Sequence, residues 1–127
     1  MILPILYIAQ STAKGRGVFT STFIPANTNI EIAPVLVLNS EERTHVEKTM
    51  LYNYIFEWGD DGEQAVVALG YISIYNHAID FNCKYEMDFD ALTISIITSR
   101  DILIGEELFI NYNPIGKEDQ PVWFPVE

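Results

Sequence analysis

The sequence predicts a mostly β domain built from small curved sheets, with one or two short helices. Short apolar segments rich in β-branched residues recur along the chain, separated by turn residues. One of them, Leu92-Thr93-Ile94-Ser95-Ile96, alternates apolar and polar residues, as a half-buried strand does. A single segment has helical spacing. This pattern leaves open whether the sheets form a barrel, a sandwich or a folded ribbon.

In chain order, strands are expected at residues 5–8, 17–22, 29–33, 35–38, 64–69, 84–89 and 92–98. The first lies in an apolar start that has no basic residue and carries Pro4, so it is interpreted as a buried strand and not as a signal peptide. Residues 59–62, Gly-Asp-Asp-Gly, and residues 89–91 are expected to connect neighbouring strands as hairpin turns.

The expected helical insert spans residues 39–56. Asn39 or Ser40 can cap its start, and Glu41 and Glu42 occupy the first turn, where negative charge is favourable. Apolar residues then recur near helical spacing up to Tyr54, where the helix is expected to give way to a strand at about residues 54–58.

Length and composition favour one domain over residues 1–127, with enough apolar residues for a core. The single cysteine, Cys83, excludes an internal disulfide and a Cys-rich zinc cluster, and no metal is expected. A net charge of −11 disfavours nucleic-acid binding and suits a basic polypeptide partner, although it also serves solubility. No segment is long and apolar enough to span a bilayer, so a cytoplasmic location is expected.

Lys14-Gly15-Arg16-Gly17 is the first of three segments that could carry chemistry. Two glycines one residue apart let the backbone turn sharply and approach a ligand closely. Taken alone, the segment is best explained as a tight turn between strands. It lacks the third glycine and the following helix of a dinucleotide-binding loop.

The second segment runs from Asn76-His77 to Cys83 within an apolar stretch. A buried Asn-His pair needs hydrogen-bond partners, and satisfaction by the backbone is the ordinary outcome. One histidine with Asp80 and Cys83 nearby is weak support for zinc, and nothing around Cys83 predicts a reactive thiolate.

The third segment runs from Gly105-Glu106-Glu107 to Tyr112. If it is a strand, Leu108, Ile110 and Tyr112 share one face. Glu106 and Glu107 would then point to opposite faces, which excludes a glycosidase carboxylate pair. Core packing is the default role for a single tyrosine.

All three segments, in this order, resemble the signature motifs of the SET-domain protein-lysine methyltransferases, over about residues 14–113. The small size and the absence of flanking cysteines make the chain most similar to the short viral and bacterial members. The resemblance implies a β-clip-like fold in which the Asn-His segment threads under the loop that ends at the tyrosine, forming a pseudoknot.

The resemblance also implies residue roles and a cofactor, S-adenosylmethionine, with no metal. Tyr112 would be the catalytic tyrosine. The cofactor-binding residues would be Gly15, Arg16, Gly17, Asn76, His77 and Trp123, and the substrate channel would be lined by Tyr54, Tyr75 and Ile110. The aliphatic Ile110 favours multiple methylation. Trp123 and Phe124, in the tail 113–127, could replace the missing cysteine-rich segment and stack on adenine, or simply cover an apolar edge.

Two departures from the family pattern keep a second hypothesis open. Ala78 stands where the family usually has Ser, and Phe81 stands where it usually has Pro. The chain could therefore be a methyltransferase of a basic lysine-containing protein, histone or other, or a SET-like module that binds a partner without catalysis. A homodimer is also compatible with the aromatic C-terminus.

Overall fold

A computed structural model of the chain describes residues 1–12 and 15–111. Within these ranges nine strands, one α-helix and two 3-10 helices are present. The strands are β1 (Leu6–Gln10), β2 (Arg16–Thr20), β3 (Asn29–Leu38), β4 (Ile55–Trp58), β5 (Gln64–Ala68), β6 (Asn76–His77), β7 (Cys83–Asp88), β8 (Thr93–Thr98) and β9 (Glu107–Ile110). The helices are α1 (Ser40–Val46), η1 (Met50–Asn53) and η2 (Ile72–Ile74). The predicted mostly β class is confirmed.

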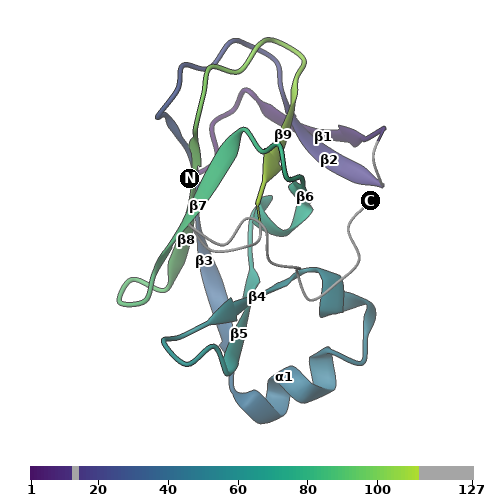
Figure 1. Cartoon of the computed structure of the whole chain (residues 1–127), viewed down its shortest axis with the longest axis vertical. Helices are drawn as coiled ribbons and strands as arrows, with labels where there is room; N and C mark the ends of the chain where they lie inside the picture. The colour runs from purple at the N-terminus through teal and green to yellow at the C-terminus, as the bar shows by residue number, and fades with distance from the viewer. Residues whose placement is uncertain (13–14, 112–127) are drawn as a thin grey trace.

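The strands join in the order β1-β2-β9-β7-β8-β3-β5-β4, and β6 pairs with β9 beside this path. The result is an open, curved sheet in which β9, late in the sequence, lies between the N-terminal hairpin and the β7–β8 hairpin (Figure 1). β9 is antiparallel to β2 and parallel to both β6 and β7. Segments far apart in the sequence therefore meet at β9.

The expected strands 29–33 and 35–38 form one ten-residue strand, β3. Its first part pairs with β8 as far as Pro34↔Thr93, and its second part pairs with β5 from Val35↔Ala68 onward. Pro34 has no backbone N–H to donate to a neighbouring strand, and the change of partner falls at this residue. The two strands expected on either side of Pro34 are therefore one continuous strand.

The helical segment is shorter than expected. Asn39 is the N-cap, one of the two residues expected to cap this helix, and it forms a capping box with Glu42. The α-helix nevertheless ends at Val46, η1 follows, and Ile55 and Phe56 belong to β4. The expected change to a strand at about residues 54–58 is confirmed by β4. No residue of α1, all seven of which are described, is buried, so the apolar spacing that suggested a longer helix does not reflect a packed face.

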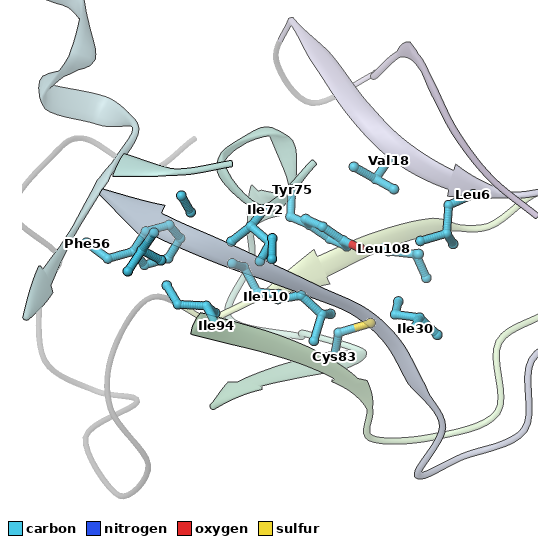
Figure 2. Packing of buried hydrophobic residues seen from close by; sticks show 14 of the residues in the cluster. Leu6, Val18, Ile30, Phe56, Ile72, Tyr75, Cys83, Ile94, Leu108 and Ile110 are labelled. Atoms are coloured by element: carbon cyan, nitrogen blue, oxygen red, sulfur yellow. The ribbon is translucent and has the colours of Figure 1, made fainter. Parts of the chain in front are cut away.

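The hydrophobic core lies beneath the sheet and gathers side chains from most of the strands (Figure 2). Ile94 and Ile96 of β8 and Leu108 and Ile110 of β9 are fully buried, which confirms the alternation read in both segments. The turns at 59–62 and 89–91 do connect β4 to β5 and β7 to β8. In the described ranges no helix has the length and apolar character needed to cross a membrane.

Candidate cofactor and active site

The turn of the N-terminal hairpin is formed by the predicted glycine segment. Gly15 has a positive φ of 50°, and its carbonyl accepts hydrogen bonds from the Ser11 amide at 2.8 Å and from Gln10 Nε2 at 2.7 Å. β1 and β2 pair from Gln10↔Arg16 inward. Gly15 and Arg16 are exposed, and among the described residues no atom lies within 4 Å of a Cβ added to Gly15. Gly15 thus directly precedes β2, in which Arg16 and Gly17 are the first residues.

Gly17 is buried against β6 and β9. A Cβ added there would overlap the carboxylate of Glu107 and come within 3.0 Å of Asn76 Nδ2. A residue without a side chain is needed here because two polar side chains from distant segments occupy the space.

Four residues from three segments, Ser11, Gly17, Asn76 and Glu107, form what we call the polar cluster. Asn76 Nδ2 donates to Glu107 Oε2 at 2.8 Å and to the Arg16 carbonyl at 3.1 Å. Ser11 Oγ donates to Glu107 Oε1 at 2.7 Å. Glu107 therefore joins the hairpin to β6. Sequence analysis missed this role because it considered Glu107 only as one half of a carboxylate pair with Glu106.

His77 is buried next to this cluster. β6 runs parallel to β9 in the register Asn76↔Phe109 and His77↔Ile110, and the Ala78 amide donates to the Ile110 carbonyl at 3.1 Å. The structure thus brings together five predicted cofactor-binding residues, namely Gly15, Arg16, Gly17, Asn76 and His77.

Asn82 is a second residue that sequence reasoning missed. Its side chain is 1% exposed, with Nδ2 donating to the Glu107 carbonyl at 2.9 Å and Oδ1 accepting from the Phe109 amide at 2.8 Å. The Asn82 amide also donates to the Phe109 carbonyl at 3.2 Å. Asn82 therefore fixes β9 where it carries Glu107. A carboxamide within an apolar run was the available signal.

The predicted channel residues occupy different environments. Tyr75 is 1% exposed in the core, and its hydroxyl donates to Glu31 Oε1 at 2.9 Å. Burial, followed by the charge of Glu31, raises the pKa of Tyr75, so this phenol is neutral. Ile110 is fully buried in the same core (Figure 2), while Tyr54 is half-buried and its carbonyl accepts from Ser73 Oγ at 2.8 Å. Their place in a channel stays a prediction.

Tyr112, Trp123 and Phe124 lie outside the described residues, as does Lys14. The described chain ends at Asn111, which is buried directly after β9.

Cys83 does not have the environment of a nucleophile. The side chain is fully buried, and burial raises the pKa of its thiol to about 12, with Arg100 opposing and Glu106 adding to the shift. At neutral pH the group is therefore a thiol. Among residues 1–12 and 15–111, no three His, Cys, Asp or Glu side chains gather as metal ligands would.

A separate groove of about 530 Å³ lies between the β4–β5 and β7–β8 hairpins, bounded by Trp58, Gln64 and Phe89. It shares no residue with the polar cluster. Its position at the far ends of these hairpins separates it from the glycine turn, so we do not assign the cofactor to it.

Comparison with known proteins identifies the family. The model of the SET domain matches residues 15–113. A Schizosaccharomyces pombe histone-lysine N-methyltransferase, specific for H3 lysine-37, is 42% identical over 108 residues, covering 84% of this chain and 72% of that protein.

Solved structures agree on the fold. A candidate histone methyltransferase of Plasmodium falciparum superposes with a TM-score of 0.70 at 27% identity, covering 88% of this chain and 96% of that one. A stimulated polycomb repressive complex 2 superposes with a TM-score of 0.76 at 20% identity, covering 90% of this chain and 16% of that one, which speaks for the fold alone. With the family model matched across the glycine turn, β6 and β9, the chain belongs to the SET-domain family of protein-lysine methyltransferases.

Proposed function

We propose that this protein methylates a lysine side chain of a histone, with S-adenosylmethionine as the methyl donor. The observation that carries the proposal is the polar cluster, which joins the glycine turn to Asn76 and Glu107 and sets His77 beside them. The histone substrate is suggested by the relative that acts on H3 lysine-37, and the net charge of −11 suits a basic histone tail.

The residues present fit this cofactor. Gly15 is exposed, and no atom of the described residues lies within 4 Å of a Cβ added to it, so a ligand can approach the backbone closely. Glu107 is only half-buried, and each carboxylate oxygen accepts one hydrogen bond in the cluster while having two lone pairs. Its negative charge complements a cationic ligand. Gly15, Arg16, Gly17, Asn76 and His77 would hold the cofactor, and Trp123 would cover it.

When bound, S-adenosylmethionine supplies a methyl group made electrophilic by its sulfonium. The protein's part is to align the lysine amine with that carbon and to keep the amine neutral. A water-excluded channel beside Tyr54 would lower the pKa of the amine, because burial disfavours its charged form. The hydroxyl of Tyr112 would orient the amine in line with the methyl group.

The departures at Ala78 and Phe81 do not interrupt the meeting of β6 and β9. The Ala78 amide donates to the Ile110 carbonyl, a bond that a Ser hydroxyl is not needed to make. The family's pseudoknot would place Tyr112, just after β9, near His77. These points favour an active enzyme over a binding module. The cytoplasmic location, the homodimer and multiple methylation governed by Ile110 stay predictions.

The test combines binding and turnover. S-adenosylhomocysteine should raise the melting temperature of the wild type, because a ligand bound only by the folded state stabilises it. Recombinant histone H3 and a peptide containing lysine 37 should gain 14 Da per methyl group in a mass spectrum, and the peptide with that lysine replaced by arginine should not. Tyr112→Phe should lower turnover by at least about a hundredfold while cofactor binding persists.

Two outcomes would reject parts of the proposal. A wild type that neither binds S-adenosylhomocysteine nor methylates histone excludes the methyltransferase, and histone binding without cofactor binding would identify a SET-like binding module. Labelling of another basic protein, with none on histone, would keep the reaction and replace the substrate.

A further inference from the structure

Glu31 is a charged residue inside the hydrophobic core. It is 0% exposed, as is its neighbour Ile30, although successive strand residues normally face opposite sides. The register shift between Asn29 and Glu31 on β3 explains this, because a bulge re-aims one side chain. The bulge thus buries the carboxylate of Glu31 in the core. This costs desolvation free energy that an apolar side chain at the same position would not.

Two donors from one segment satisfy this carboxylate. The Tyr71 amide donates to Glu31 Oε2 at 2.7 Å, and the Tyr75 hydroxyl donates to Glu31 Oε1 at 2.9 Å. Gly70 has a positive φ of 66°, and a Cβ added there would overlap the same carboxylate. The turn from Gly70 to Tyr75 is therefore wrapped closely around Glu31.

Both partners donate, which suits a carboxylate that only accepts. Burial raises the pKa of Glu31, while the hydrogen bonds from Tyr71 and Tyr75 and the charge of the Met1 amino group oppose the rise. A leucine at position 31 could fill the volume but could accept neither bond, leaving the Tyr71 amide and the Tyr75 hydroxyl without this acceptor.

This turn leads directly into the candidate site. Tyr75 precedes Asn76, whose side chain reaches Glu107, and His77, which pairs with Ile110. In Figure 2 the Tyr75 ring lies in the core with Ile72, Leu108 and Ile110. Tyr75 is thus bound to Glu31 through its hydroxyl and directly precedes the first residue of β6.

We propose that Glu31 and Tyr75 are positioning residues, a buried pair that fixes the segment Gly70–Tyr75 and so sets Asn76 and His77 for cofactor binding. The inference rests on the proposed function for the identity of the ligand. It assigns a task in that site to two residues that are remote from the glycine turn in the sequence and buried beneath it.

The test uses Glu31→Gln and Tyr75→Phe, with Ile94→Val as the matched control. Gln has nearly the shape of Glu, and Phe differs from Tyr by the hydroxyl alone. Ile94→Val removes one methyl group from the same core and lowers stability, and Ile94 belongs to β8 and not to the segment 70–77. Affinity for S-adenosylhomocysteine, melting temperature and hydrogen exchange of the Ala78 amide are measured for all three variants.

The pair should act on binding beyond any loss of stability. Each variant should weaken S-adenosylhomocysteine binding about five- to tenfold relative to Ile94→Val, roughly the net effect of one typical intramolecular hydrogen bond. The double variant should be little worse than either single variant, because the two residues act as one unit. Exchange at Ala78 should quicken in both and stay unchanged in Ile94→Val.

Affinities of both variants within twofold of Ile94→Val, together with unchanged exchange at Ala78, would overturn the inference and leave the pair a structural one. If Glu31→Gln does not fold, Tyr75→Phe decides by the same measurements. If the wild type binds no S-adenosylhomocysteine, the proposed function fails, and exchange at Ala78 decides the positioning role alone.

Discussion

The polar cluster and the α1–η1 segment, residues 40–53, are stabilised in opposite ways. In the polar cluster, side chains from three distant segments meet, and a glycine makes room for them. In the α1–η1 segment, the bonds are mostly local, such as the Asn39–Glu42 capping box and the Arg43–Glu47 ion pair at 3.0 Å. The cluster should therefore control ligand binding, and the helix should control little beyond its own stability.

Gly17→Ala should have the largest effect on binding. The new Cβ would overlap Glu107 and displace it or Asn76, so affinity for S-adenosylhomocysteine should fall at least about thirtyfold, roughly 2 kcal/mol. Isothermal titration measures this. Gly62→Ala is the matched control, since its positive φ of 68° makes the change strained but remote from the cluster. Equal affinities for Gly17→Ala and the wild type would remove the steric argument.

Asn82→Ala should lower the free energy of unfolding by about 2–4 kcal/mol. It leaves the Glu107 carbonyl and the Phe109 amide without their side-chain partner beside the core. Urea denaturation measures the change. Asn53→Ala, an exposed site at the end of η1, should stay within about 0.5 kcal/mol of the wild type. A similar loss in both variants would show that β9 does not depend on this carboxamide.

Asn39→Ala should have the smallest effect, about 1 kcal/mol, confined to α1. The Glu42 amide, which donates to Asn39 Oδ1 at 2.8 Å, should exchange faster, while affinity for S-adenosylhomocysteine stays within about twofold. Asn39→Ser keeps an acceptor and should retain slow exchange. A tenfold loss of affinity in Asn39→Ala would break the contrast between the two regions.

The sequence predicts best what depends on neighbours along the chain. The alternation around Ile94, the helix N-cap at Asn39 and the hairpin turns arise from local chemistry, and all of them are present. The apolar spacing up to Tyr54 did not produce one continuous helix, because α1 ends at Val46, η1 follows, and neither helix has a buried residue.

The same difference between local and distant contacts decides which parts of the candidate site could be predicted. Gly17 and Asn76 were predicted through an ordered motif resemblance, but their mutual contact was not, since it depends on the register of β2 and β6 with β9. Glu107, Asn82 and Glu31 were missed for this reason. Each is an ordinary polar residue in sequence, and its task is set by partners 25 to 96 residues away.

The contact of Ser11 with Glu107 spans 96 positions, and it has a consequence for biosynthesis. During translation the N-terminal hairpin leaves the ribosome long before β9 exists, and it must wait for its last partner. Such non-local pairing slows folding and leaves strand edges exposed in the interval. Nascent chains halted before residue 107 should therefore be the species that need chaperones, and ligand recognition should begin only after β9 has been synthesised.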